Sequence, residues 1–492
     1  MVWQEALKKK PPLAAAGETE VPRLFKRTVG SQSAVRRILL ILSETFLILS
    51  AGILAAYVRL HSDASWEITH RQGWIKLLLV AIVIQFSFHL FDLYDLRASS
   101  HRYRLMVMNL MKAYITASAM LLLMFYAVPS MLLGRGVFLW SLALSLLATA
   151  LWRLIFAWGA GHPQLGVRER ILILGSGTEA IEIARATLER RTAGFQIIGF
   201  VDNKPELLGK SLINPSVIGL TENLPGLVAQ HRIDRIVVAV EDRRGSMPTG
   251  DLLNLRLSGR VAVEESACFY ERLTGKVAVE KLRPSWLIFS RGGRYTDVTE
   301  RTRRVVNASL AAVGLLISLP LDLIIAIAIK LDSPGPILYR QERVGKNGRR
   351  FKIIKFRSMG VGAEEESGPV WAAATDPRAT RVGRVLRKLR LDEIPQFVNV
   401  ARGDMNFIGP RPERPEFVEQ LSTTLPYYMQ RHLIKPGLTG WAQICYGYGG
   451  SVEDTMQKLQ YDLYYIKNRS LLLDIIIVFE TIKIVLFGRG AR

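Results

Sequence analysis

The chain has 492 residues and a formal net charge of +22 at pH 7, a length that suits about three folding units. Hydrophobic residues make up 49% and charged residues 22%, which excludes a disordered chain and is unusual for a soluble enzyme. A chain that is both apolar and strongly basic indicates a membrane protein. Its two cysteines, Cys268 and Cys445, lie far apart without a metal-binding pattern, so neither a disulfide framework nor a structural zinc site is predicted.

The N-terminal third is predicted to form four membrane-spanning helices. Residues 1–36 are basic and contain no apolar core, so we expect a cytosolic tail and not a cleavable signal. Four apolar runs follow within 37–160, each close to the roughly 20 residues that cross a bilayer. They are Ile38–Val58, Trp74–Tyr94, Leu110–Val128 and Val137–Trp158. Basic residues precede the first run and separate the second from the third, which places the chain after residue 158 in the cytosol.

Polar residues inside these runs leave two interpretations. Glu44, Gln85 and His89 would mark an ion path in a transporter, or they would make contacts between helices. We favour helix contacts, because no obvious relay accompanies Glu44 and His89.

Residues 165–285 have the pattern of a Rossmann-like α/β domain. Apolar strand-like runs at 170–174, 195–203 and 233–240 alternate with helical stretches, as in a parallel doubly wound sheet. Gly175 and Gly177 have the spacing of a dinucleotide-binding turn, and Asp202 follows the second run, where it could hold a ribose. The alternative, which we favour, is a structural domain with an empty or regulatory pocket, because a single fingerprint is weak and a fold does not fix a function.

A fifth apolar segment, at 305–330, is predicted to be a re-entrant helix. Pro320 must bend it, Ser318 is placed to satisfy a freed backbone group, and Asp322 would cost about 3 kcal/mol in a straight span. Both flanks are basic, so both prefer the cytosol. The alternative is a conventional fifth span. A re-entrant helix would place the remaining chain at the cytosolic membrane surface.

Residues 331–492 combine many Arg and Lys residues with a few carboxylates. Such a region suits anionic lipid or phosphates, and nucleic acid is the weakest choice because stacking aromatics are missing among the basic residues. Asp392 and Glu393 precede Pro395, so they should lie at a helix start, where the dipole and basic neighbours would keep them ionised. Paired ionised acids suit phosphoryl chemistry with a nucleophile and a metal. A simple acid pair at a helix start is the alternative.

An ordered series of motifs in 322–492 is more specific than any of these patterns. It comprises Ser-Pro-Gly-Pro (333–336), Arg-Gln-Glu-Arg-Val-Gly (340–345), Lys-Phe-Arg-Ser-Met (355–359), Asp-Pro-Arg (376–378), Leu-Asp-Glu-Ile-Pro-Gln (391–396), Gly-Asp-Met (403–405), Gly-Pro-Arg-Pro-Glu (409–413) and Lys-Pro-Gly-Leu-Thr-Gly-Trp (435–441). This series resembles the bacterial sugar transferase family, the monotopic polyprenyl-phosphate hexose-1-phosphate transferases. Together with the earlier regions, the chain resembles the large members that initiate exopolysaccharide or O-antigen assembly. Its ending is similar to the exosortase-associated subgroup.

The resemblance implies a fold, a reaction and a set of site residues. The expected architecture is four transmembrane helices, a Rossmann-like domain and an α-rich monotopic catalytic domain at 300–492. Asp392 would attack the sugar-linked phosphate of a UDP-hexose and release UMP, and undecaprenyl phosphate would then take the sugar phosphate. Glu393 would assist, and Asp392 and Glu393 would hold Mg²⁺ together with substrate phosphates.

Further residues follow from the same resemblance. Arg387 and Arg411 are the matched candidates for phosphate contact, whereas four others are either phosphate, structural or headgroup contacts: Gln341, Arg343, Lys355 and Arg357. The family's helix break is typically Ser-Pro, but here Leu319 separates Ser318 from Pro320, and Arg390 stands where Ser or Thr is common. The implied setting is the cytosolic face of a bacterial inner membrane, in contact with the bilayer, with a homodimer as a family-level expectation.

Two other functions remain open from sequence. A membrane-anchored oxidoreductase or sugar epimerase is disfavoured, since the chain has no Tyr-x-x-x-Lys pair. A non-catalytic scaffold or regulator of polysaccharide assembly would share the same architecture. Residues 461–486 are predicted to form interfacial helices, with a soluble core helix as the alternative. No motif fixes which hexose is used.

Overall fold

The computed structural model describes residues 31–70, 73–94, 103–160, 169–189, 194–240, 247–281, 297–363, 378–447, 449 and 451–487. Contacts divide the described residues into one unit that ends at Ser266 and another that begins at Ala267. Residues 1–30 of the predicted tail lie outside the described residues, and a helix begins at Ser31. We expected the Rossmann-like domain to continue to 285, whereas the division falls at Ser266.

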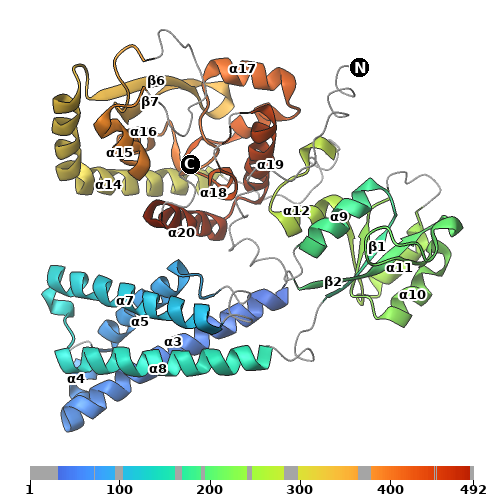
Figure 1. Ribbon diagram of the computed structural model, residues 1–492, viewed down its shortest axis with the longest axis horizontal. Coiled ribbons are helices and arrows are strands. Elements are labelled where there is room, and N and C mark those ends of the chain that lie inside the picture. The colour runs from blue at the N-terminus through green and yellow to red at the C-terminus, as the bar shows by residue number, and fades with distance from the viewer. Residues whose placement is uncertain are drawn as a thin grey trace. The chain divides into compact units, whose positions relative to one another are not determined.

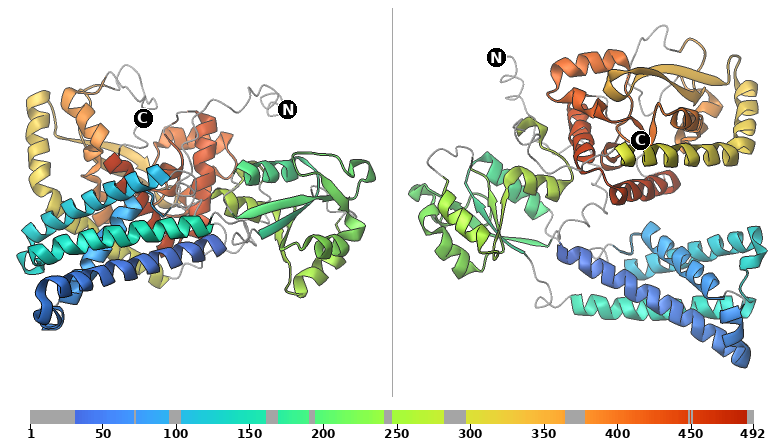
Figure 2. Two further views of the ribbon diagram at one scale, coloured as in Figure 1. Left: turned by 60° about the horizontal axis from the view of Figure 1, so that its bottom comes forward. Right: turned by 180° about the vertical axis from the view of Figure 1, so that it is seen from behind.

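The first unit begins with long apolar helices in the places that the sequence predicts. They are α3 (Ser31–Leu60), α5 (Gly73–Leu90), α7 (Tyr103–Ala127) and α8 (Arg135–Ala160), with the short α4 (Ala64–His70) after α3. These helices lie side by side (Figures 1 and 2) and bury a shared core that includes Ile84, Phe88 and Leu110. Within the described residues, five helices are long and apolar enough to cross a membrane, α14 of the second unit being the fifth.

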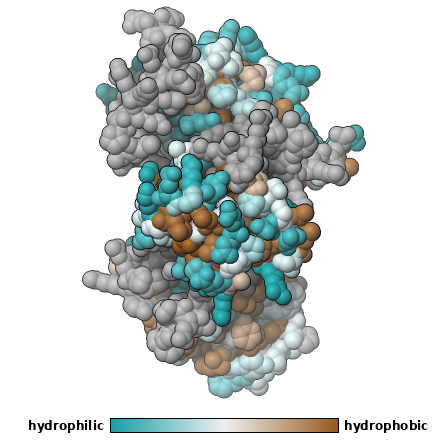
Figure 3. All heavy atoms as spheres, turned by 90° about the vertical axis from the view of Figure 1, so that its right-hand side faces the viewer, coloured by the Kyte–Doolittle hydropathy of each residue, from teal (hydrophilic) through white to brown (hydrophobic). Residues whose placement is uncertain are grey.

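Apolar side chains cover the outer faces of these helices. Phe46 and Leu123 are each 70% exposed and Tyr126 is 89% exposed, which in water would leave an unusually large apolar surface. On the face drawn in Figure 3, brown apolar side chains are interrupted by hydrophilic ones. The exposure therefore suits helices that hydrocarbon surrounds.

A buried ion pair joins two of the helices. Arg153 of α8 contacts Glu44 of α3 with an Nε–Oε1 distance of 2.7 Å, and it donates a 2.6 Å hydrogen bond to the carbonyl of Leu93. Gln85 donates to Ile41 and Thr45 of α3. Glu44 and Gln85 thus make contacts between helices, as the favoured interpretation expects. The sequence did not indicate Arg153 as the partner of Glu44, because Arg153 lies within the fourth apolar run.

The rest of the first unit is a parallel α/β sheet, as predicted. Its strands are β1 (Glu169–Leu174), β2 (Phe195–Asp202), β3 (Val217–Leu220), β4 (Arg235–Val238) and β5 (Ala262–Glu265), all paired in parallel in the order β3-β2-β1-β4-β5. Helix α9 (Thr178–Glu189) covers one face, and α10 (Leu224–His231) and α11 (Thr249–Leu257) cover the other (Figure 1). This is a doubly wound arrangement with its crossover next to β1.

The second unit is rich in helices. Its helices are α12 (Ser266–Thr274), α14 (Asp297–Asp332), α15 (Arg381–Leu389), α16 (Gln396–Arg402), α17 (Pro415–Thr424), α18 (Trp441–Cys445), α19 (Val452–Asn468) and α20 (Leu471–Phe487). An antiparallel hairpin of β6 (Leu338–Val344) and β7 (Arg350–Phe356) and a short parallel pair of β8 (Asn406–Ile408) and β9 (Gly437–Thr439) complete it.

Helix α14 turns sharply partway along its length (Figures 1 and 2). Pro320 lies inside it and removes a backbone donor, which is a usual cause of such a bend. Ser318 Oγ donates to Asp322 Oδ2 at 2.7 Å and to the Leu315 carbonyl at 3.3 Å, so its hydroxyl bridges the bend. The bent helix exposes apolar side chains on both sides of the proline, including Leu316 and Leu323.

Helix α20 turns its charged residues toward the protein. Asp474 pairs with Arg303 of α14 at 2.6 Å and accepts a 2.7 Å hydrogen bond from Tyr465, while Leu471 and Leu472 are exposed. An exposed apolar face combined with buried charges suits a helix at a membrane interface.

Candidate active site

The predicted carboxylate pair lies in a tight turn between two helices. Arg390 ends α15 in the left-handed conformation, with φ at +56°, and its amide donates to the carbonyls of Leu386 and Arg387. A single 3₁₀ turn at Leu391–Glu393 follows, and α16 begins at Gln396 after Pro395. Asp392 and Glu393 therefore lie just before a helix start, where the sequence placed them.

The helix that follows the carboxylates is fixed from two sides. Asn399 of α16 accepts a 3.0 Å hydrogen bond from the Ile354 amide of β7 and donates one of 2.8 Å to the Lys352 carbonyl. Arg304 of α14 donates 2.9 Å hydrogen bonds to the last carbonyls of α16, those of Val400 and Ala401. The β6–β7 hairpin, α14 and the turn that carries the two carboxylates are thereby held in one geometry.

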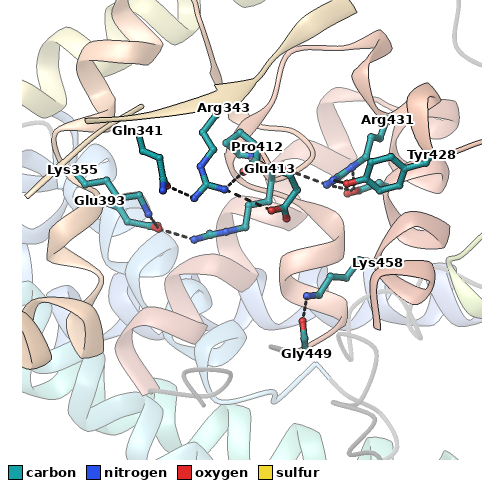
Figure 4. Close-up of polar contacts among 12 residues, drawn as sticks. Gln341, Arg343, Lys355, Glu393, Pro412, Glu413, Tyr428, Arg431, Gly449 and Lys458 are labelled. Carbon is teal, nitrogen blue, oxygen red and sulfur yellow. Dashed lines mark hydrogen bonds and ion pairs between the residues drawn. The ribbon is translucent and has the colours of Figure 1, made fainter. Parts of the chain in front are cut away.

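Glu393 is the centre of a cationic cluster. Its Oε1 atom lies 2.9 Å from Lys355 Nζ of β7 and 3.0 Å from an Arg411 guanidinium nitrogen, and Lys355 and Glu393 point toward each other in Figure 4. Arg411 also donates a long 3.4 Å hydrogen bond to Gln443 Oε1 of α18. The neighbouring Asp392 is 9% exposed, and within the described residues its carboxylate accepts no hydrogen bond. Glu393 is thus fixed by two cations, whereas no hydrogen bond within the described residues engages the carboxylate of Asp392.

The two carboxylates have opposite pKa shifts. Burial raises the pKa of Asp392 above its usual value, and the charge of Glu393 adds to this, while Lys355 opposes it. Burial also acts to raise the pKa of Glu393, but Lys355 and Arg411 outweigh it and hold that pKa well below the usual range. We expected the helix dipole and the adjacent basic helix to keep both acids ionised. Instead, Lys355 from β7 is the strongest attraction on both.

The raised pKa of Asp392 predicts how the rate of sugar-phosphate transfer depends on pH. The nucleophilic role that the resemblance implies for Asp392 requires the carboxylate form, so the rate of sugar-phosphate transfer should fall on the acidic side at a higher pH than for an ordinary aspartate. Lys355→Met removes the main attraction that lowers this pKa, so the acidic limb should move further toward neutral pH. The pH profile of kcat/KM for both proteins checks this, and an unmoved limb would contradict it.

A second set of residues supports the loop that carries Arg411. Gln341 accepts a 2.6 Å hydrogen bond from Arg343, which also donates to the Pro412 carbonyl at 3.2 Å and lies 3.6 Å from Glu413 (Figure 4). Arg343 therefore contacts the segment after Arg411 directly, and Gln341 contacts Arg343. Arg343 is bound to that loop, which favours the structural interpretation of these two.

A buried guanidinium holds the same loop from the other side. Arg431 donates to the Arg411 carbonyl at 3.0 Å, to the Tyr428 hydroxyl at 2.8 Å and to Asp462 at 2.9 and 3.1 Å. Burial raises the pKa of Asp462 to about 6, against the attraction of Arg431. The backbone and the side chain of Arg411 are therefore both fixed.

Other predicted residues lie away from this cluster. Arg357 is buried and donates to Ser333 and Pro334, so it fastens the loop after α14. Ser318 and Pro320 lie inside α14, where the proline is a usual cause of a bend. The charge of Arg387 acts on the cluster by lowering the pKa of Asp392, although burial outweighs it.

The predicted nucleotide pocket belongs to the other unit. Gly175 follows β1 with φ at +112°, and a Cβ there would lie 2.6 Å from the Ala239 carbonyl oxygen, so the backbone conformation and the packing both require glycine. Gly177 opens α9, where its carbonyl accepts from the Ile181 amide. Asp202 ends β2 and accepts a 3.2 Å hydrogen bond from the Lys204 amide. These contacts give Gly175 and Asp202 structural roles that do not depend on a bound nucleotide.

Gln443 and Arg431 are the site residues that the sequence argument missed. Gln443 lies two residues beyond the last quoted motif, which ends at Trp441, so a search beyond that motif would have found it. Arg431 carries no local signal, because its role depends on long-range contacts with Arg411 and Asp462.

The donors for a metal are few. Within the described residues, no group of three or more His, Cys, Asp or Glu side chains could hold a metal ion. Asp392 and the Oε2 atom of Glu393, which has no hydrogen bond in that part of the chain, remain as two carboxylate donors. Such a partial set fits Mg²⁺, which often binds one or two carboxylates and completes its ligands with water and substrate phosphates.

Two family models match the chain. The model described as Bacterial sugar transferase matches residues 298–488, and the one described as CoA-binding domain matches residues 89–246. The first therefore covers α14 and the whole carboxylate cluster, and the second covers most of the parallel sheet.

Curated relatives match mainly the C-terminal region. The UDP-N-acetylgalactosamine-undecaprenyl-phosphate N-acetylgalactosaminephosphotransferase of Aeromonas hydrophila is 46% identical over 45% of this chain and 52% of its own. The undecaprenyl-phosphate glucose phosphotransferase of Komagataeibacter xylinus is 34% identical over 65% of this chain and 60% of its own. The exopolysaccharide production protein PSS of Rhizobium leguminosarum bv. phaseoli is 40% identical over 36% of this chain and 90% of its own. The chain thus spans little more than half of the first two relatives and nearly all of the third.

Proposed function

This chain belongs to the bacterial sugar transferase family, and from that premise we propose that it transfers a sugar 1-phosphate from a UDP-hexose to undecaprenyl phosphate. The observation that carries the proposal is the pairing of a buried, unbonded carboxylate, Asp392, with the Lys355–Glu393–Arg411 cluster. Relatives named as undecaprenyl-phosphate phosphotransferases support the lipid acceptor.

The proposed reaction has two steps. A carboxylate oxygen of Asp392 attacks the sugar-linked phosphorus of the UDP-hexose, the bond to the bridging oxygen breaks, and UMP leaves with the electron pair. An oxygen of undecaprenyl phosphate then attacks the same phosphorus, which forms the diphospho-sugar lipid and restores the carboxylate. Initiation of exopolysaccharide or O-antigen synthesis is the proposed role of this product.

The cluster supplies charge where the reaction develops it. Arg411 is the most exposed member, with 31% of its side chain accessible, so it is placed to meet the diphosphate. Glu393 holds Arg411 and Lys355 in position, which avoids reorganisation during the reaction. Arg387 is the second proposed phosphate contact. Mg²⁺, held by Asp392 and Glu393 with substrate phosphates, would neutralise diphosphate charge.

Release of UMP tests the proposal directly. Purified full-length protein in nanodiscs should release UMP from at least one UDP-sugar in a panel that includes glucose, galactose and their N-acetylated forms, and the release should continue only when undecaprenyl phosphate is present. Omitting Mg²⁺ should slow it. Folded protein that releases no UMP from any donor would favour the scaffold or regulator function.

We propose that α14 is re-entrant and that the catalytic unit lies on the cytosolic face of the inner membrane. The bend at Pro320 and the basic residues at both ends support this topology. A homodimer remains the family-level expectation, and light scattering of the protein in detergent would test it.

Cysteine labelling tests the topology. With Cys268 and Cys445 replaced by Ser, the exposed positions Arg301→Cys and Lys346→Cys should both react with a membrane-impermeant maleimide only in inverted vesicles. Labelling of the two positions from opposite sides would show a fifth span and contradict a re-entrant helix.

A further inference from the structure

A segment upstream of the family match is built into the catalytic unit. The match begins at residue 298, yet residues 271–279, here called the 271–279 arm, belong to the C-terminal unit. Val277 and Val279 are 1% and 2% exposed, and they lie in one buried cluster with Tyr428 and Leu459. Neither the quoted motifs nor the proposed reaction gives this arm a role.

Polar contacts fix the arm along its length. Glu271 pairs with Lys467 at 2.6 Å and accepts a 2.6 Å hydrogen bond from Asn468, both at the end of α19. The Gly275 carbonyl accepts a 2.9 Å hydrogen bond from the indole of Trp441, a side chain that is 1% exposed. The Val277 amide donates to the Gln460 carbonyl of α19 at 3.1 Å. The arm is therefore held at α18 and at two points of α19.

The elements that the arm contacts are those that hold Arg411. Trp441 opens α18, which two residues later presents Gln443 to the guanidinium of Arg411. Gln460 lies two residues before Asp462, the partner of Arg431, and Arg431 donates to the Arg411 carbonyl. Tyr428, which accepts from Arg431, shares the buried cluster with both valines of the arm.

From these contacts we propose that the 271–279 arm is a positioning element for Arg411 in the transfer reaction. It completes the wall behind the loop of Arg411, so a loosened arm would displace α18 and the Tyr428–Arg431–Asp462 group together. Displacement of a charged group by about 1 Å can lower a rate roughly 100-fold. The inference rests on the proposed function.

The test uses full-length protein in nanodiscs and measures UMP release, after wild type has shown activity. Val277→Thr places a hydroxyl in the apolar cluster with almost no change in shape. We expect kcat to fall about tenfold with KM for the UDP-sugar changed less than about threefold, as for a lost positioning contact. Val418→Thr is the matched control, because it makes the same change in the same cluster from α17 and should lower kcat less than about twofold.

A double-mutant cycle distinguishes an effect that acts through the position of Arg411 from a general loss of packing in the buried cluster. If the arm acts through Arg411, Val277→Thr should have less than about a twofold effect on kcat in an Arg411→Lys background. Trp441→Phe, which removes the donor to Gly275 together with part of the buried ring, serves in the same cycle where Val277→Thr does not fold. Equal losses in Val277→Thr and Val418→Thr, or effects that multiply with Arg411→Lys, would overturn the proposal. An inactive wild type would instead reject the proposed function.

Discussion

Replacing Asp392 by Asn should lower lipid-dependent UMP release by about 10³-fold or more, because the amide has the shape of the carboxylate but is not a nucleophile. The variant should fold, since within the described residues this carboxylate accepts no hydrogen bond that could be lost. Its melting temperature should not fall, because a carboxyl whose pKa is raised in the folded state is disfavoured as a charge at neutral pH.

Labelling of the protein sharpens this test. Wild type incubated with a radiolabelled UDP-sugar and no lipid should become labelled, and the Asp392→Asn variant should not. Glu416→Gln is the control, because Glu416 is an exposed carboxylate of α17, and its rate should stay within about twofold of wild type. A variant at Asp392 that keeps both rate and label would place the nucleophile elsewhere.

Replacing Glu393 by Gln should lower kcat by about 100-fold, through the two cations that it holds. Lys355 and Arg411 would lose their shared counter-charge, so each would lose its fixed position beside Asp392. Stability at neutral pH should fall by about 1–3 kcal/mol, less than for a fully buried pair because Arg411 is partly exposed.

The pH dependence of this stability loss has a definite sign. The folded-state pKa of Glu393 is lowered, so its contribution is present above the usual glutamate pKa and is lost as the pH falls through the folded value. The difference in unfolding free energy between wild type and variant should therefore shrink in acid. Glu342→Gln is the control, because its pair with Arg350 is exposed and 3.7 Å long, and a difference that does not shrink would contradict the assignment.

Apolar runs in the sequence predicted the long apolar helices and the central strands of the parallel sheet. The apolar run at 74–94 corresponds to α5, and the strand-like run at 195–203 to β2. Both segments are mainly apolar over the length of their element, so their type can be recognised without tertiary contacts. The short helix α4 was missed because it has seven residues and no comparable apolar run.

The site was predictable in its residues but not in its pairings. Proline spacing placed Asp392 and Glu393 at a helix start, which depends only on neighbouring residues. The bonds from Lys355 and Arg411 to Glu393 cross 38 and 18 residues, and no local pattern determines contacts over such separations. For the same reason the sequence could not distinguish Arg357, which is committed to Ser333 and Pro334, from the arginine that faces the carboxylates.

The hydrogen bonds from Arg304 of α14 to the carbonyls of α16 affect how the lipid substrate reaches Asp392. A lipid phosphate stays in the headgroup layer, because lifting it would pull its isoprenoid chain into water. The height of the nucleophile must therefore match that layer. Arg304 of α14 donates hydrogen bonds to the end of α16. Asn307, also in α14, accepts a 2.9 Å hydrogen bond from the Phe407 amide. Asp392 lies one turn before α16. In the proposed topology, the depth of α14 in the bilayer would therefore set the distance between Asp392 and the headgroup layer.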